Sequence, residues 1–400
     1  MNFLIRTRQF FFSLAGHIEA PLLPEALSGD KSLNLVPDML YVSGKKNVLI
    51  VTTAGTVKRG TLRTFCDNLA GKNIRYDIFS DVSPDPTVEC AKACLKAYKD
   101  ANAQAVIAIG GGSVMDCAKV AMALLVNPGK EVCKLKGLLK VRHRIPDLYA
   151  VPTTAGTGSE TTAAAVITDT VNGLHIKYAV TDFKLIPRYA ILDPSLTVGL
   201  PPSITAATGM DALTHAVEAY TNCFASDYVK TRATDAVKLI YQNLPDCYAG
   251  KADLKARENM LVASFLAGQA FTLNFVGYVH AIAHAVGALY GIPHGEANAI
   301  ILPYVLEQFG APVYAKLARL YEAAGLATAT DNTDAGKAAA FIASIRKLNA
   351  NMGISDKFEV LNPDDFELIA DRALAEAVPA YPTPVIWTRH DFIKLLEKLV

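Results

Sequence analysis

The first half of the chain alternates short apolar runs with amphipathic stretches, and this alternation constrains the fold more than any other feature. The apolar runs have strand length and lie at residues 47–52, 75–79, 105–109, 148–151 and 190–192. A helical pattern over Pro86 to Asp100, with Val88, Ala91 and Leu95 on one face, separates two of these runs as a crossover helix does. Strands connected in this way form a parallel sheet covered by helices.

The second half is different, because strand signals fade after Leu200 and long helical patterns replace them. These patterns lie at residues 203–220, 255–271, 279–289, 311–325, 334–351 and 391–399. A chain of 400 residues, 51% of them hydrophobic, is long enough for two domains. We predict an α/β domain with a parallel sheet in residues 1–200 and an all-helical domain in residues 201–400, with residues 1–25 as an atypical N-terminal extension.

The charge balance and the cysteines exclude several classes of protein. Basic and acidic residues number 39 and 38 and form no long run, so we expect no nucleic-acid or membrane partner. No segment approaches the roughly 20 apolar residues of a membrane span, and the apolar patch from Phe10 to Ala15 is shorter than a signal-peptide core. The seven cysteines are scattered without a CxxC pair, which argues against a disulfide framework. We expect a cytoplasmic protein with a small-molecule ligand.

A glycine turn follows the strand predicted at residues 105–109. The turn consists of Gly110, Gly111, Gly112 and Ser113, and a helical pattern over residues 114–126 comes next. Glycines let a backbone approach a pyrophosphate closely, and the free N–H groups and positive end of the helix face its charge. The turn is therefore a candidate phosphate site. A purely structural turn stays open as the alternative, because the pattern is neither GxGxxG nor a Walker A loop.

A second loop, residues 152–160, also follows a predicted strand. It contains three threonines, one serine and two glycines. An ordinary polar turn is the alternative, but this density of hydroxyl groups at the end of a strand favours a ligand loop. In an open α/β sheet the ends of two strands at a crevice are where a nucleotide is expected.

A carboxylate and several histidines share a helical spacing in the second half. Asp211 and His215 are four residues apart, His280 and His284 repeat the spacing, and His294 follows in a predicted loop. Three imidazoles and one carboxylate suit a divalent transition metal. The spacing leaves open which of the three later histidines bind the metal, and whether it is Fe²⁺ or Zn²⁺.

Five ordered motifs resemble those of the iron-containing, or group III, alcohol dehydrogenases. They are GGGSVMDCAK at 110–119, PTTAGTGSE at 152–160, ILDPSLT at 191–197, ATGMDALTHAVEAY at 207–220 and HAIAHAVGALYGIPHG at 280–295. The resemblance extends from about Leu40 to near the C-terminus. It implies an N-terminal dinucleotide-binding domain, a helical C-terminal domain, and a metal and cofactor in the cleft between them.

The resemblance also implies roles for individual residues. The implied metal ligands are Asp211, His215, His280 and His294, and His284 is the catalytic candidate because its family counterpart lies close to the nicotinamide and the substrate. The candidate cofactor contacts are Thr53, Asp85, Gly110, Gly111, Gly112, Ser113, Asp116, Thr153, Thr154, Thr157 and Lys177. Where many NAD-using relatives carry an aspartate after the first strand, this chain has Thr52, Thr53, Ala54 and Gly55. Without that carboxylate a 2′-phosphate is not repelled, so either NAD or NADP is expected.

We therefore predict a metal-dependent, NAD(P)-dependent oxidoreductase that interconverts an alcohol and an aldehyde or ketone by hydride transfer. Fe²⁺, with Zn²⁺ as the alternative, polarises the substrate oxygen, and His284 relays a proton. A primary alcohol, a diol and a sugar-acid hydroxyl remain open as substrates, and the resemblance implies a homodimer. Two other functions remain open: a lyase similar to 3-dehydroquinate synthase, and a non-catalytic nucleotide- or metal-binding protein.

Overall fold

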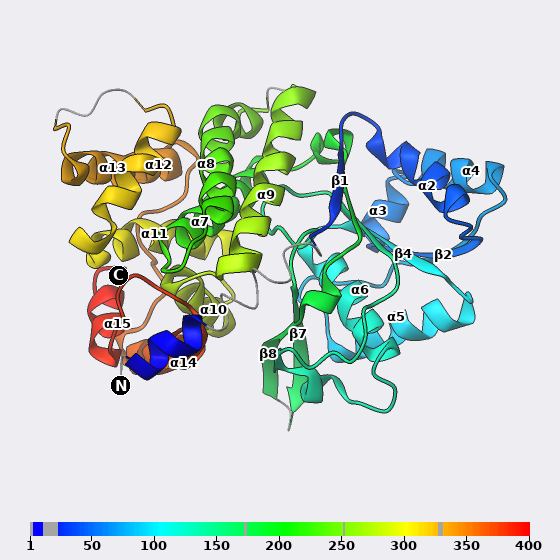
Figure 1. Ribbon diagram of the computed structural model, residues 1–400, viewed down its shortest axis with the longest axis horizontal. Coiled ribbons are helices and arrows are strands. Elements are labelled where there is room, and N and C mark those ends of the chain that lie inside the picture. Colours follow the sequence, from blue (N-terminus) through cyan, green and yellow to red (C-terminus); the bar gives the residue numbers. More distant parts are fainter. Residues whose placement is uncertain (1–2, 11–22, 172–173, 251–252, 327–330) are drawn as a thin grey trace. The chain divides into compact units, whose positions relative to one another are not determined.

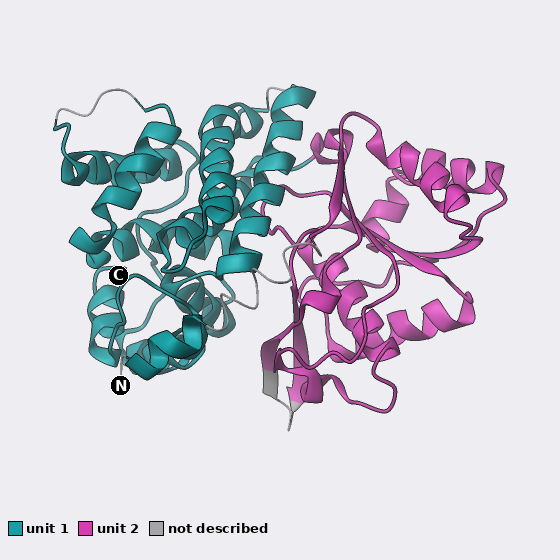
Figure 2. Ribbon diagram, viewed as in Figure 1, with its two compact units in different colours: residues 1–20, 200–400 teal, residues 21–199 magenta. Residues whose placement is uncertain are grey.

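The computed structural model describes residues 3–10, 23–171, 174–250, 253–326 and 331–400. They divide into two compact units, one of residues 21–199 and one of residues 1–20 and 200–400 (Figure 2). The first unit holds the strands and the second is helical, which confirms the predicted fold class (Figure 1).

Six parallel strands form the main sheet of the first unit. In spatial order they are β1 (Glu25–Ser28), β9 (Tyr189–Leu192), β6 (Leu148–Pro152), β4 (Ala105–Gly110), β2 (Asn47–Val51) and β3 (Arg75–Phe79). Five of them match the predicted apolar runs. Strand β1 was not predicted, because its four residues form a largely exposed edge with no apolar run.

Helices cover both faces of this sheet. They are α2 (Val36–Val42), α3 (Ala54–Lys58), α4 (Arg63–Gly71), α5 (Val88–Asp100) and α6 (Gly112–Leu125), with short 3₁₀ turns at Ser32–Leu35, Val132–Leu135, Phe183–Leu185 and Pro194–Thr197. Leu49 and Val51 of β2 pack in one core with residues of α5 and α6, whereas Val48 and Ile50 pack in another with residues of α2 and α4. Because side chains alternate along a strand, the two cores lie on opposite faces, as in a doubly wound fold.

A second, three-stranded sheet belongs to the same unit and was not predicted. Its strands are β5 (Gly137–Leu138), β8 (Leu174–Thr181) and β7 (Ala164–Val171), in that order. Strands β7 and β8 pair antiparallel and β5 pairs parallel with β8. Many of the residues of β7 and β8 are polar or only half buried, so no continuous apolar run marked these strands.

The second unit is built from helices that pack against one another. They are α7 (Pro202–Thr221), α8 (Asp227–Tyr248), α9 (Leu254–Asn274), α10 (Tyr278–Tyr290), α11 (His294–Phe309), α12 (Tyr314–Ala323), α13 (Asp334–Asn351), α14 (Phe366–Ala380) and α15 (Arg389–Leu396), with 3₁₀ turns at Ala311–Val313 and Pro363–Asp365. Helix α7 packs against α8, α9 and α11, and α10 packs against α11 and α14. Helices α8, α11 and α14 were not predicted.

The N-terminal segment packs on α14. Residues 3–10 form a helix, drawn in blue beside α14 in Figure 1. The guanidinium of Arg6 donates to the carbonyls of Thr383 and Pro384, and the amide of Gln9 donates to those of Val378 and Tyr381. The compact grouping therefore places this segment with the helices, whereas the sequence division at residue 200 had included it in the α/β domain.

Within the described residues, no single helix is long and apolar enough to cross a membrane. Helices α9 and α10 reach that length and apolarity only as a pair, and the chain bends by 102° between them.

Candidate metal centre and cofactor loops

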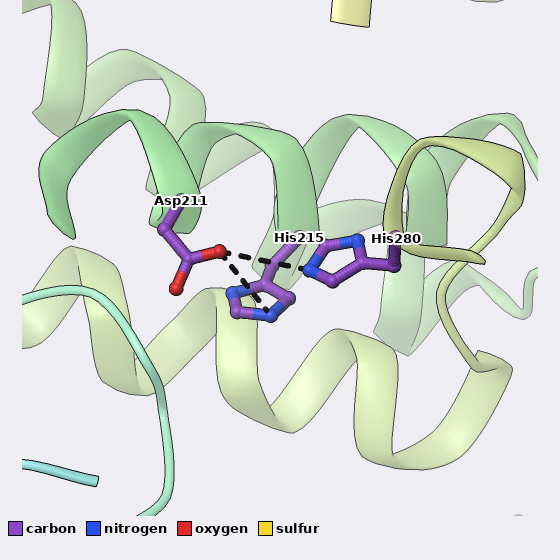
Figure 3. Close-up of side chains that lie close together, drawn as sticks. All are labelled: Asp211, His215 and His280. Carbon is purple, nitrogen blue, oxygen red and sulfur yellow. Dashed lines mark ion pairs between the residues drawn. The ribbon is translucent and has the colours of Figure 1, made fainter. Parts of the chain in front are cut away.

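Helix α7 presents an acid and an imidazole from one face. Asp211 and His215 are one turn apart and only 2% and 4% exposed. Their Oδ1 and Nε2 atoms lie 3.9 Å apart (Figure 3). The residues around them in α7 are also buried, and most are apolar. The two polar side chains therefore lie in a site that is largely shielded from water.

Two further imidazoles converge on the same carboxylate oxygen. His280 on α10 places Nε2 3.6 Å from Asp211 Oδ1, and His294 on α11 places Nε2 3.5 Å from it. Ligand atoms about 2.1 Å from one ion lie about 3.4 Å apart in a tetrahedral arrangement, so these spacings fit the ligands of a single divalent cation. Asp211, His215 and His280 also form a cluster of described residues in which all ligand atoms lie within 4.8 Å of one another.

A glycine allows α11 to reach this cluster. A Cβ at Gly295 would lie 2.2 Å from the backbone oxygen of Ala207 on α7, a distance that no side chain tolerates. His294, which we expected in a loop, is instead the first residue of α11. The close approach of the two helices is what brings His294 within reach of Asp211.

Glu218 orients the imidazole of His280 through the ring nitrogen that does not face Asp211. Its Oε2 lies 2.6 Å from His280 Nδ1 and accepts a hydrogen bond from the backbone of Gly277, while its Oε1 accepts one from Val279. With Nδ1 held by a carboxylate, Nε2 of His280 is the ring nitrogen that faces Asp211. This carboxylate–histidine pair is the arrangement that metal-binding histidines commonly have.

The electrostatics of the cluster favour an ionised acid. Burial by itself would raise the pKa of Asp211, but His215, His294 and His280 hold it well below its usual value. Burial also lowers the pKa of His280, yet Glu218 and Asp211 outweigh that effect and raise it to about 9. Buried negative charge surrounded by imidazole nitrogens is a donor set for Fe²⁺ or Zn²⁺.

His284 lies beside the cluster with partners of its own. Its Nδ1 lies 2.8 Å from Glu376 Oε1, which also accepts a 2.8 Å hydrogen bond from the hydroxyl of Tyr381. The His284 ring stacks on that of His294 with centroids 5.1 Å apart, and its side chain is 38% exposed. His284 is thus next to the candidate metal ligands, and it has access to solvent.

The two candidate cofactor loops are adjacent because their strands are neighbours in the sheet. Gly110 at the end of β4 is in register with Pro152 at the end of β6, and its carbonyl accepts from the backbone of Thr153. A Cβ at Gly112 would lie 3.2 Å from the side chain of Thr157, so the first turn of α6 and the hydroxyl-rich loop touch. The backbone amides of that helix start and the hydroxyls of the loop therefore border one edge of the sheet.

One hydroxyl of this region is consistent with a ligand. The Oγ1 of Thr154 is buried and has no hydrogen-bond partner among the described residues. A buried donor without a partner is costly, and a pyrophosphate oxygen would satisfy it. The residues present at this edge thus fit a dinucleotide.

Asp116 and Lys119, both on α6, form hydrogen bonds with the hydroxyl-rich loop and the residues that follow it. Asp116 accepts hydrogen bonds from the Ser159 hydroxyl and from the backbone of Val166. The fully buried ammonium of Lys119 lies within hydrogen-bond distance of five oxygens, which belong to Ser159, Thr162 and Ala164, at 2.6 to 3.2 Å, and its three N–H groups are shared among them. The carboxylate of Asp116, which we expected to contact the cofactor, is thus engaged with the protein.

The remaining candidate cofactor contacts also belong to the first unit, residues 21–199. Thr53 caps α3 just after β2, and its Oγ1 accepts from the backbone of Thr56. Asp85 and Lys177 form an exposed ion pair with each other at 2.5 Å. Ser113 is in the first turn of α6. A role for these residues in binding a cofactor stays a prediction.

Sequence reasoning missed four residues of the site: Glu218, Asn298, Glu376 and Tyr381. The first two carried a signal, since Glu218 lies three residues after His215 and Asn298 lies four after His294, both on apolar helices. Glu376 and Tyr381 are about 90 residues from His284 in the chain and only the fold brings them together.

Comparison with known proteins identifies the family. A model described as "Iron-containing alcohol dehydrogenase" matches residues 24–194, and one described as "Fe-containing alcohol dehydrogenase family, C-terminal" matches residues 205–400. Among curated proteins, alcohol dehydrogenase 4 of Schizosaccharomyces pombe is 36% identical, over 93% of this chain and 86% of its own. The 1,3-propanediol dehydrogenase of Klebsiella pneumoniae is 35% identical, over 87% and 90%. The NAD-dependent methanol dehydrogenase of Bacillus methanolicus is 34% identical, over 94% and 97%.

Solved structures give the same result. A crystal structure of 1,3-propanediol oxidoreductase superposes with a TM-score of 0.89 at 32% identity, covering 94% of this chain and 98% of its own. Sulfoacetaldehyde reductase from Bifidobacterium kashiwanohense, in complex with NAD⁺, superposes with a TM-score of 0.84 at 27% identity, covering 94% and 96%.

Proposed function

The chain belongs to the iron-containing alcohol dehydrogenase family, and from this premise we propose that it interconverts a small primary alcohol or diol and the matching aldehyde, using a divalent metal and a nicotinamide cofactor. The observation that carries the proposal is the convergence of three imidazole nitrogens on Asp211 Oδ1 at 3.5 to 3.9 Å in a largely buried site. One carboxylate and three imidazoles are a donor set that suits a divalent transition metal.

Each group of residues has a task in this proposal. Asp211, His215, His280 and His294 would hold Fe²⁺, with Zn²⁺ as the alternative. When bound, the cation acts as a Lewis acid toward an alcohol or carbonyl oxygen, and the nicotinamide exchanges the hydride. Glu218 fixes the tautomer of His280, so that its Nε2 lone pair points to the cation position.

His284 is proposed to move the proton that alcohol oxidation releases. Its Nδ1 is engaged by Glu376, so in the neutral ring the proton lies on Nδ1 and Nε2 can accept another. Tyr381 holds the same carboxylate oxygen and thereby fixes the orientation of Glu376. Because the His284 side chain is partly exposed, a proton taken up at Nε2 can pass to water.

The cofactor is proposed to be NAD, bound with its pyrophosphate at the glycine turn and the hydroxyl-rich loop. In support, the methanol dehydrogenase relative is named NAD-dependent and the sulfoacetaldehyde reductase structure contains NAD⁺. NADP stays the alternative, because Thr53 stands where an aspartate would repel a 2′-phosphate.

The names of the relatives also support the substrate class, since they include dehydrogenases of 1,3-propanediol and of methanol. A homodimer is proposed from the family resemblance, and light scattering of the purified protein tests it. No observation favours the lyase that the sequence left open, because both family models describe alcohol dehydrogenases.

Metal analysis combined with a cofactor assay tests the proposal. The purified protein is analysed for iron and zinc, then assayed for NAD⁺ and NADP⁺ reduction with methanol, ethanol and 1,3-propanediol, before and after chelation. We expect activity that chelation removes and that Fe²⁺ or Zn²⁺ restores. His215→Ala is the matched control, in which added metal restores little. Activity that is insensitive to chelation contradicts the metal role, and bound metal without reduction of either cofactor favours the non-catalytic alternative.

A further inference from the structure

The side chain of Asn298 lies among the candidate metal ligands, although it is outside the five sequence motifs and outside the residue roles that the family resemblance implies. Asn298 is one turn after His294 on α11 and is completely buried. Its Nδ2 lies 2.8 Å from Asp211 Oδ1, 3.2 Å from His280 Nε2 and 3.1 Å from His294 Nε2. One amide nitrogen therefore contacts three of the four proposed ligand atoms.

The oxygen of the same amide is in a different situation. Oδ1 of Asn298 is buried and lacks a hydrogen-bond partner among the described residues. A buried carbonyl oxygen without a partner is unfavourable, so an apolar or smaller side chain would ordinarily be the more stable choice at this position. Packing alone therefore does not explain why asparagine occupies position 298.

We propose that Asn298 is a fifth residue of the metal centre, a positioning group that strengthens cation binding by aligning Asp211, His280 and His294. This inference rests on the metal dependence proposed above. The amide nitrogen donates to the Asp211 carboxylate and lies within hydrogen-bond distance of Nε2 of His280 and of His294, and so holds the three side chains around a common point. Partners of metal ligands in this position commonly set the affinity of a site.

The carboxamide also suits a cation electrostatically. A half-turn about its last side-chain bond exchanges the NH₂ group for the partnerless oxygen, which is attracted to positive charge rather than repelled by it. No ionised side chain carries both an N–H donor and an oxygen acceptor. A carboxylate would lie against the Asp211 carboxylate, whose nearest oxygen is 2.8 Å from Nδ2, and an ammonium would compete directly with the metal.

Zinc affinity in three variants tests the proposal. The dissociation constant of Zn²⁺ is measured by competition with a chromogenic chelator in the wild type, Asn298→Ala, Asn298→Asp and Asn349→Ala. Asn349 is the matched control because it is also buried, also has an Oδ1 without a hydrogen-bond partner among the described residues, and donates to the carbonyl of Ala299 on α11. We expect Asn298→Ala to bind Zn²⁺ about 10- to 100-fold more weakly, Asn298→Asp to bind it more tightly, and Asn349→Ala to match the wild type.

Thermal unfolding with and without Zn²⁺ separates this role from a purely structural one. A ligand that binds only the folded state raises the unfolding temperature, and at a fixed ligand concentration the rise grows with the logarithm of its affinity. Asn298→Asp should unfold at a lower temperature than the wild type in chelator, because two carboxylates then adjoin, and should gain more from Zn²⁺ than the wild type does. A structural role predicts instead that each variant shifts equally with and without Zn²⁺.

Two outcomes overturn the inference in distinguishable ways. If the wild type binds Zn²⁺ and Asn298→Ala binds it equally well or more tightly, only the role of Asn298 is wrong. If the wild type itself binds neither Zn²⁺ nor Fe²⁺, the proposed metal-dependent function fails, and the inference fails with it.

Discussion

The carboxylate of Glu218 accepts three hydrogen bonds, one from His280 Nδ1 at 2.6 Å and two from backbone amides at the start of α10. A single side chain thus fixes both where the helix begins and how its first imidazole is turned. Gly277 is part of this arrangement, because a Cβ there would lie 2.7 Å from Glu218 Oε1. The position of His280 therefore depends on α7 as much as on its own helix.

Glu218→Gln should weaken metal binding without removing a metal ligand. An amide has one acceptor oxygen in place of two, so at least one backbone N–H or the imidazole N–H of His280 loses its acceptor. We expect the dissociation constant of the metal to rise about 10- to 100-fold, which competition with a chelator measures. Glu359→Gln, which changes an exposed carboxylate, is the control. Equal metal affinity in all three proteins would show that the His280–Glu218 contact is structural only.

His284→Ala should separate turnover from metal content. His284 is outside the four proposed ligands, so the variant should retain the metal of the wild type while kcat falls about 100-fold or more, the usual contribution of general acid–base catalysis. Metal analysis and a steady-state assay on the same preparation check this. Glu376→Gln should lower kcat less and change its dependence on pH, because the imidazole remains but its tautomer is no longer fixed. Unchanged kcat in His284→Ala rules out the proton role.

The sequence predicted those parts of the fold and site that local patterns encode. Buried parallel strands such as β4 are continuous apolar runs, and Asp211 and His215 keep their spacing on one helix. What it could not predict depends on chain segments that meet only after folding. The Glu376–His284 contact spans 92 residues, and β1 is recognisable only through its pairing with β9. The start of helix α11 is hard to recognise because the sequence Pro293-His294-Gly295 resembles a turn, whereas in the structure Gly295 allows α11 to approach α7.

Lys119→Met should impair cofactor binding while leaving the metal centre intact. Removing the ammonium takes away a donor that lies among five oxygens of residues 159–164, so the hydroxyl-rich loop loses most of its hydrogen bonds to α6. We expect a raised KM for the nicotinamide cofactor, an unchanged dissociation constant for the metal, and a lower unfolding temperature. An unchanged KM together with lowered stability would make Lys119 a stabilising residue alone.

The stability of the protein should also depend on Lys119 at alkaline pH. Burial lowers the pKa of this ammonium from 10.5 to about 8. Between these two values the unfolded chain binds the proton more strongly than the folded one, so the contribution of Lys119 to stability rises as the pH increases through this window. The free energy of unfolding of the wild type minus that of Lys119→Met should therefore grow from pH 8 to pH 10, by at most about 3 kcal/mol. Denaturant titrations of both proteins at several pH values measure it, and a constant difference contradicts the shift.

Thr53→Asp should decide which nicotinamide cofactor the protein discriminates against. Thr53 is the N-cap of α3 directly after β2, and aspartate caps a helix as well as threonine does, so the variant should fold normally. The new carboxylate would stand near the adenosine ribose, where it repels a 2′-phosphate and can accept from a 2′-hydroxyl. We expect kcat/KM for NADP to fall about tenfold or more and that for NAD to stay equal or rise, which parallel assays with both cofactors measure. Thr56→Ser, a neighbouring conservative change, should leave the ratio of the two values as it is in the wild type. If Thr53→Asp also leaves that ratio unchanged, the ribose does not approach the end of β2, and the cofactor must be oriented by the loops at β4 and β6 alone.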